Sequence, residues 1–119
     1  MGTTAIEHPQ DGGWRPFRCS TLPHRDELWL APEGELDMES ANVLSALVSE
    51  YLEAGFPRLV LDLRALTFMD SSGLHVLLEA RQHAAARGVD LCVSPGPPGV
   101  QRILDVTGTA ELFRPAPPR

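Results

Sequence analysis

The chain has 119 residues, of which 43% are hydrophobic and 22% are charged, and its 10 Lys and Arg against 16 Asp and Glu give a net charge of −6 at pH 7. This length fits one domain, and the composition is that of an ordinary soluble globular protein. The acidic balance argues against nucleic-acid binding, which needs clustered basic side chains, and no apolar run approaches the roughly 20 residues that span a membrane.

The first third of the chain predicts an unstructured start followed by two strands. Residues 1–13 are polar and contain Gly and Pro, so we expect a flexible arm before the domain. They also lack the pattern of a signal peptide, which makes the cytoplasm the expected location. Residues 14–21 alternate loosely and predict a first strand. Residues 26–37 predict a second strand, in which Pro32 indicates an edge or a bulge.

A helix is predicted over residues 39–54, where apolar side chains recur at three- and four-residue spacing. Asp37 is a suitable N-terminal cap for this helix, and Gly55 is a suitable end. The next apolar run, residues 58–63, is short and nearly continuous. It therefore predicts a strand that is covered on both faces.

The rest of the chain continues this alternation of helices and strands. The expected elements are a second helix from about Ser71 to Gly88, a strand at 89–94, a brief helix at 100–106, an edge strand or packing patch at Leu112 and Phe113, and a Pro-rich tail at 115–119. The order β-β-α-β-α-β-α-β predicts a single α/β domain over residues 14–114. We expect a mixed central sheet of four to five strands, with helices packed mainly on one face.

No group of residues predicts a metal site or a catalytic centre. Cys19 and Cys92 are too far apart for a zinc site or a disulfide framework, and their apolar, strand-like surroundings indicate buried thiols. His75 and His83 share a helix but lack a third ligand. Ser71 lies in no nucleophile elbow, and its polar neighbours in sequence do not make a catalytic triad.

The start of the second helix is a place where a modification could act. Helix starts carry unpaired backbone N–H groups and the positive end of the helix dipole, which stabilise a phosphate without basic side chains. Ser71 and Ser72 could both accept one, and the missing side chain of Gly73 would leave room for its approach. The same residues after Asp70 also make an ordinary helix cap, which contributes about 1 kcal/mol. The local pattern leaves both interpretations open.

Three segments, taken together and in order, resemble a known family. They are GELD at residues 34–37, LVLDLRALTFMDSSGL at residues 59–74, and GVQRILDVTGTAELF at residues 99–113. This set resembles the STAS domain, the family of bacterial anti-sigma factor antagonists. The match spans roughly residues 27–114, and FMDSSGL is its most specific part.

The resemblance implies a binding protein that has no catalytic residues, metal or cofactor of its own. In this family the unmodified antagonist binds an anti-sigma factor and so releases a sigma factor. The anti-sigma factor is typically also a serine kinase that phosphorylates the antagonist, and a metal-dependent serine phosphatase restores it. The implied acceptor is Ser71, with Asp37, Asp70, Ser72 and Gly73 around it as the partner-binding surface. A free antagonist is expected to be a monomer, without nucleic-acid or membrane contact.

Two other functions stay open at this point. A STAS subunit of a larger assembly, such as a lipid-transport complex or a stress-signalling scaffold, would use the Ser71 region as an interface without modification. A small enzyme or a nucleotide-binding protein is the other possibility. The absence of a glycine-rich phosphate loop and of a paired acid and base argues against it.

Overall fold

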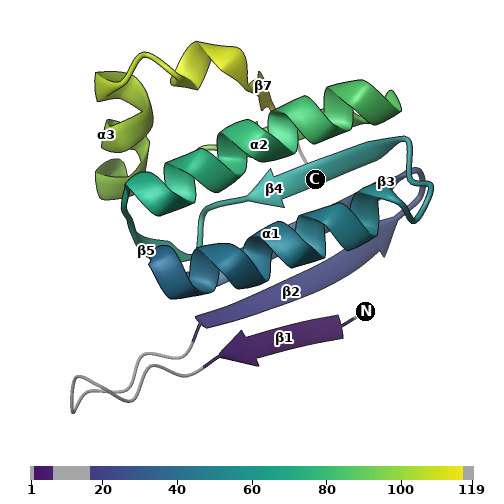
Figure 1. Cartoon of the computed structure of the whole chain (residues 1–119), viewed down its shortest axis with the longest axis horizontal. Helices are drawn as coiled ribbons and strands as arrows, with labels where there is room; N and C mark the ends of the chain where they lie inside the picture. The colour runs from purple at the N-terminus through teal and green to yellow at the C-terminus, as the bar shows by residue number, and fades with distance from the viewer. Residues whose placement is uncertain (1, 7–16, 117–119) are drawn as a thin grey trace.

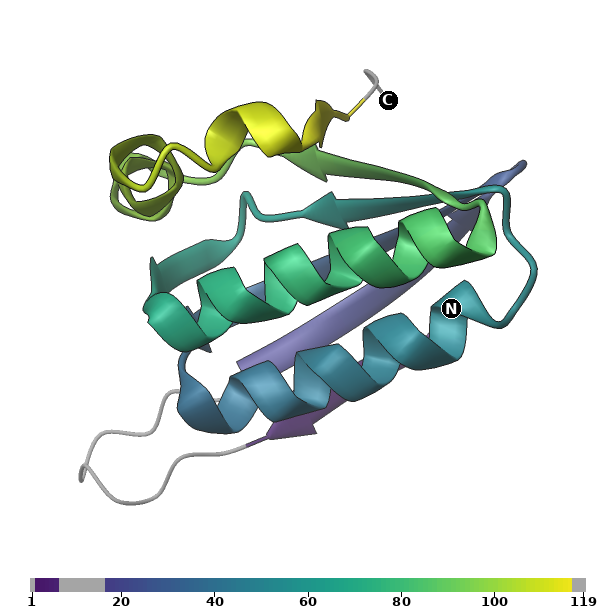
Figure 2. The ribbon, with the colours of Figure 1, turned by 45° about the horizontal axis from the view of Figure 1, so that its top comes forward.

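The computed structural model of the chain describes residues 2–6 and 17–116, which form a single sheet and its helices. The elements in chain order are β1 (Gly2–Ile6), β2 (Phe17–His24), β3 (Glu27–Leu36), α1 (Met38–Leu52), β4 (Arg58–Asp62), β5 (Leu66–Met69), α2 (Ser71–Arg87), β6 (Asp90–Ser94), α3 (Pro98–Val106), the 3-10 helix η2 (Ala110–Leu112) and β7 (Arg114–Pro115). Helices α1 and α2 lie side by side over one face of the sheet (Figures 1 and 2). In the described part of the chain, no helix combines the length and apolar character needed to cross a membrane.

The sheet is mixed, as predicted. Its strand order is β1-β2-β3-β4-β6-β7, and β5 pairs separately with β3. The pairs β1·β2 and β2·β3 are antiparallel, whereas β3, β4, β6 and β7 run parallel to one another. The predicted α/β class, with helices mainly on one face, is confirmed. The described sheet has seven strands rather than four to five, because the sequence pattern did not indicate β1 or β5 and placed the last strand differently.

Both ends of the chain enter the sheet, which corrects two expectations. The predicted flexible arm, residues 1–13, contains β1, whose five residues pair antiparallel with β2. The remainder of that arm lies outside the described residues. The tail predicted from Pro115 begins as β7, and Ala116 N donates to Val93 O at 3.2 Å. Strand pairing uses backbone groups, so polar and Pro-containing segments can cover sheet edges that would otherwise stay unpaired.

The main core lies between the sheet and the two long helices. The side chains that α1 and α2 bury there are Ala41, Leu44, Val48 and Leu52 together with Val76, Leu77, Ala80 and Ala84. The periodic pattern predicted both helices, because a helix needs an apolar stripe to pack on a sheet. Cys19 and Cys92 are free and buried, as predicted.

Strand β4 is buried on both faces, which its continuous apolar run predicted. Leu59 and Leu61 belong to the main core, whereas Val60 belongs to a second cluster with Trp29 and Cys92 on the opposite face. The central strand therefore contributes side chains to both apolar clusters, and a one-residue shift of its register would exchange the two sets of side chains.

A buried carboxylate, Asp62, joins the carboxyl ends of β4 and β6. Asp62 Oδ1 accepts hydrogen bonds from Ser94 Oγ at 2.9 Å and from Arg64 N at 3.1 Å. The Arg64 guanidinium forms a two-point contact, with each nitrogen–oxygen distance at 2.8 Å. Ser94 Oγ also accepts from Leu63 N at 3.0 Å. The hydrogen bonds from the Arg64 side chain are the main reason why the pKa of Asp62 lies below its ordinary value of 3.8.

We expect Asp62→Asn to lower the free energy of unfolding by about 1–3 kcal/mol at pH 7, because hydrogen bonds to a charged group are lost. Since the folded-state pKa is lowered, this contribution is present above pH 3.8 and is lost as the pH falls through the folded-state value. Urea unfolding of both proteins should show a difference in the free energy of unfolding that is constant from pH 7 to about pH 4. This difference should shrink between about pH 4 and pH 3. Glu111→Gln, which changes an exposed carboxylate, should stay within about 0.5 kcal/mol of the unchanged protein. A difference independent of pH would contradict this role of Asp62.

Candidate functional site

The pairing of β3 with β5 brings two helix starts together. Leu36 and Met69 are partners in this parallel pair, and Asp70 N donates to Leu36 O at 3.2 Å. Asp37 and Asp70 come directly after these partners, and each is the N-cap of the helix that follows. Adjacent strands lie about 4.8 Å apart, so the two capped helix starts are close neighbours. This agrees with the expectation that Asp37 lies beside the Ser71 region.

Asp70 fixes the first turn of α2. Its Oδ1 accepts from Ser72 N at 2.8 Å and from Gly73 N at 3.2 Å. The sequence-based expectation of unpaired N–H groups at this helix start is therefore wrong for these two. A phosphate on Ser71 would meet a carboxylate that already occupies them. The cap interpretation, left open above, is correct for Asp70 and leaves the hydroxyl of Ser71 available for another role.

Asp37 is held by a reciprocal cap at the start of α1. Its Oδ1 accepts from Glu39 N and Ser40 N, both at 3.1 Å, and Asp37 N donates to Ser40 Oγ at 2.9 Å. Ser40, which is fully buried, also donates to Glu35 O at 2.7 Å. The Asp37 carboxylate thus has a defined position beside the second helix start.

Ser71 is exposed at the first position of α2, and Ser72 is half-buried beside it. Both line a shallow groove of about 410 Å³ between the first halves of α1 and α2. The residues that line it are Met38, Ala41, Asn42, Ser45, Ser71, Ser72, His75, Val76 and Glu79. The lining contains no Lys or Arg, and His75 lies 3.9 Å from Glu79 at an exposed position. The groove is therefore suited to an unmodified hydroxyl and offers a phosphate no strong basic partner.

Gly73 is required by packing beneath the site. A Cβ at this position would lie 2.5 Å from Met69 Cγ and 2.8 Å from Leu36 Cδ2. The sequence pattern suggests that this glycine leaves room for a phosphate that approaches from outside. In the structure the close contacts lie inside the protein, because α2 begins directly against the ends of β3 and β5.

Two exposed apolar side chains flank the capped helix starts, and the sequence analysis did not identify them. Met38 is 71% exposed directly after Asp37, and Phe68 is 47% exposed two residues before Asp70. No sequence signal points to Phe68 as an exposed residue. The face of the sheet that it occupies follows only from the pairing of β5 with β3.

In the part of the chain that the structure describes, no cluster is suited to metal binding. Among residues 2–6 and 17–116, no group of three or more His, Cys, Asp or Glu side chains is placed to hold a metal ion. What the geometry brings together is two capped helix starts, with an exposed serine at the first position of one of them. The described residues thus form a small α/β protein whose candidate site lies at the starts of two parallel helices.

Comparison with known proteins identifies this class. The model of the STAS domain family matches residues 21–118, so the chain belongs to the STAS domain family. The resemblance inferred from the three sequence segments is thus confirmed.

Three relatives illustrate the range of the family. The chain is 34% identical over 91 residues to the anti-sigma F factor antagonist of Paenibacillus polymyxa, a match that covers 76% of this chain and 78% of the relative. The crystal structure of an anti-sigma factor antagonist from Mycobacterium paratuberculosis has a TM-score of 0.75 at 25% identity, covering 84% and 85% of the two chains. The STAS domain of a SulP transporter from Vibrio cholerae has a TM-score of 0.58 at 27% identity, covering 79% and 72%.

The packing at Gly73 leads to a stability prediction. Gly73→Ala should lower the free energy of unfolding by about 1–2 kcal/mol, because overpacking outweighs the roughly 1 kcal/mol that alanine gains in a helix. Gly99→Ala is the matched control, since a Cβ there has no atom within 4 Å and should stabilise α3 by up to about 1 kcal/mol. Urea unfolding followed by tryptophan fluorescence measures both. Equal effects of the two substitutions would show that the start of α2 is not tightly packed.

Proposed function

We propose that this protein is an anti-sigma factor antagonist, which binds its partner while Ser71 is unmodified and loses that binding when Ser71 is phosphorylated. The observation that carries the proposal is the exposed Ser71 directly after the cap Asp70, in a groove lined by no Lys or Arg. The names of the relatives from Paenibacillus polymyxa and Mycobacterium paratuberculosis support the same role. In this role the protein acts by binding, and its chemistry is supplied by other enzymes.

The phosphate would alter the surface more than the fold. Ser71 is exposed and, within the described part of the chain, its hydroxyl has no hydrogen bond that phosphorylation would break. The modification adds about −1.5 to −2 charges. The positive end of the α2 dipole favours that charge, whereas the carboxylates of Asp70 and Asp37 oppose it. These opposing effects leave the domain folded with a strongly anionic patch at the groove.

At the partner interface the same charge would be costly. A surface that accommodates a neutral hydroxyl beside two carboxylates cannot desolvate a phosphate without providing new positive charge. A penalty of about 3–4 kcal/mol weakens binding several hundredfold, since each 1.4 kcal/mol corresponds to a factor of ten. This is sufficient for a switch that needs no change of fold.

The chemistry of the switch belongs to a kinase and a phosphatase. Ser71 Oγ attacks the γ-phosphorus of ATP, the bond to the leaving ADP breaks, and the hydroxyl proton passes to a base of the kinase. We propose that the kinase is the anti-sigma factor itself and that a metal-dependent serine phosphatase hydrolyses the phosphate ester. Asp37, Asp70, Ser72 and Gly73 shape the surface that both enzymes must recognise.

A second function is favoured by one observation. The similarity to the STAS domain of the Vibrio cholerae SulP transporter fits a STAS subunit that serves a larger assembly. In that role the Ser71 groove would be a permanent interface without modification. The two functions differ in whether a kinase modifies Ser71.

The site assignment is tested by phosphorylation of the purified protein. Incubation with ATP and each candidate anti-sigma kinase from the same genome should add one phosphate, which fragment mass analysis places on Ser71. Ser71→Ala should abolish the mass increase, and Ser72→Ala should retain it. Loss of phosphorylation in Ser72→Ala alone would move the site by one residue. No modification by any kinase, together with stable binding to another complex, would favour the assembly-subunit function.

The switch is tested by affinity for the same anti-sigma factor. Phosphorylated protein should bind roughly several-hundredfold more weakly than unmodified protein. The variant Ser71→Asp should remain folded and should also bind weakly. Ser71→Ala should bind with nearly the original affinity. Calorimetry or surface-based binding measures the affinities, and circular dichroism checks the fold. Equal affinity of the phosphorylated and unmodified proteins would exclude the switch.

A further inference from the structure

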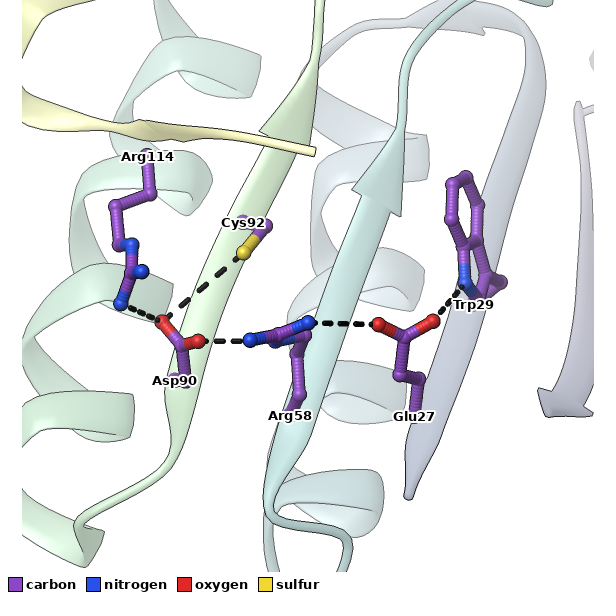
Figure 3. Close-up of polar contacts among 6 residues, drawn as sticks. All are labelled: Glu27, Trp29, Arg58, Asp90, Cys92 and Arg114. Carbon is purple, nitrogen blue, oxygen red and sulfur yellow. Dashed lines mark hydrogen bonds and ion pairs between the residues drawn. The ribbon is translucent and has the colours of Figure 1, made fainter. Parts of the chain in front are cut away.

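A row of charged side chains crosses the sheet face opposite α1 and α2 (Figure 3). Glu27, Arg58 and Asp90 are register partners on the adjacent parallel strands β3, β4 and β6. Arg58 donates from Nη1 to Glu27 Oε2 at 2.8 Å and from Nε to Asp90 Oδ2 at 2.9 Å. Trp29 Nε1 donates to Glu27 Oε1 at 2.9 Å, and Arg114 Nη1 donates to Asp90 Oδ1 at 2.9 Å. The row thus connects the centre of the sheet to β7.

The neighbouring row on this face is apolar. Trp29, Val60 and Cys92 are register partners and are only 4%, 0% and 2% exposed, although α1 and α2 lie on the other face. Ala116 packs against this cluster, and Arg114 is the register partner of Cys92. Residues 114–116, called here the β7 clasp, therefore cover the edge of the apolar row.

Few interactions hold the β7 clasp in place. Strand β7 has two residues, and Pro115 has no N–H to donate to the sheet. The side chain of Arg114 is 69% exposed, so water and salt weaken its ion pair with Asp90. Ala116 N adds one hydrogen bond, to Val93 O at 3.2 Å. A segment with so few contacts has a low free energy of opening.

The segment before the clasp, and the residue that Arg114 contacts, are both held by other interactions. Arg81 Nε donates to Leu112 O at 2.9 Å, and Phe113 packs against the main core, so the chain is anchored directly before Arg114. Asp90 keeps its ion pair with Arg58 when Arg114 leaves. The clasp can therefore separate without disturbing η2 or the central strands.

We propose that the β7 clasp opens as a local unit while the rest of the domain stays folded, exposing the Cys92 thiol and the outer edge of β6. In the closed form Cys92 is protected in two ways. It is covered, and burial, followed by the charge of Asp90, raises the pKa of its thiol so that little reactive thiolate is present. Opening uncovers the thiol and removes the effect of burial on its pKa, while Asp90 stays in place, so the reactivity of Cys92 reports the open state.

The test is pulsed labelling of the native full-length protein with N-ethylmaleimide, followed by mass mapping of both cysteines in the same sample. Cys19 is the internal reference, because it is 1% exposed in the main core and burial raises the pKa of its thiol to about 12. Cys92 should be labelled at least about tenfold faster than Cys19 under native conditions, because local openings are more frequent than global unfolding. Equal rates for the two cysteines would overturn the proposal.

Two variants separate local opening from global unfolding. Arg114→Gln removes a contact of the clasp and should accelerate labelling of Cys92 about twofold to fivefold. Val48→Ala weakens the core under α1, which the open state retains. It should raise the equilibrium population of globally unfolded protein at least about tenfold, as checked by urea unfolding, and leave labelling of Cys92 unchanged. Acceleration of Cys92 in Val48→Ala to the same extent, or none in Arg114→Gln, would overturn the proposal.

Discussion

The short parallel pairing of β5 with the end of β3 determines the geometry of the candidate site. It places Leu36 and Met69 in register, so that the chain leaves both strands at one level and starts a helix from each. This pairing makes neighbours of the two caps, Asp37 and Asp70, and of the first turns of α1 and α2. Gly73 permits this arrangement, because any side chain there would collide with the ends of both strands. A four-residue strand thus decides where the two capped helix starts meet.

The candidate site combines two firmly held helix starts with the exposed hydroxyl of Ser71. Beneath the surface, backbone caps and close packing hold both helix starts, while Ser71 projects at an exposed position above them. Chemical change at such a serine has few internal contacts to disturb, so its effect falls mainly on whatever binds the surface. A preordered surface lowers this protein's own ordering cost in any association made there.

The two faces of the sheet use different physical interactions. One face is covered by α1 and α2 through apolar packing, which tolerates no water and gives a stable core. On the other face, the carboxylates of Glu27 and Asp90 alternate with Arg58 across three strands, and a two-residue strand covers the end of the row. The first face supports the groove at the helix starts, whereas we propose that the second opens at its margin.

The sequence by itself determined the long elements and the family. Helices α1 and α2 and the central strand β4 were predicted because their apolar patterns are set by burial over many residues, and the DSSG motif marked the start of α2. The tertiary structure alone decided β1, β5 and β7, whose short segments are strands because of a distant pairing partner. It also decided that the packing beneath α2 leaves no room for a side chain at position 73, and that Met38 and Phe68 are exposed. The physical reason is that periodicity reports the burial of one segment, whereas register and close approach depend on residues far away in the chain.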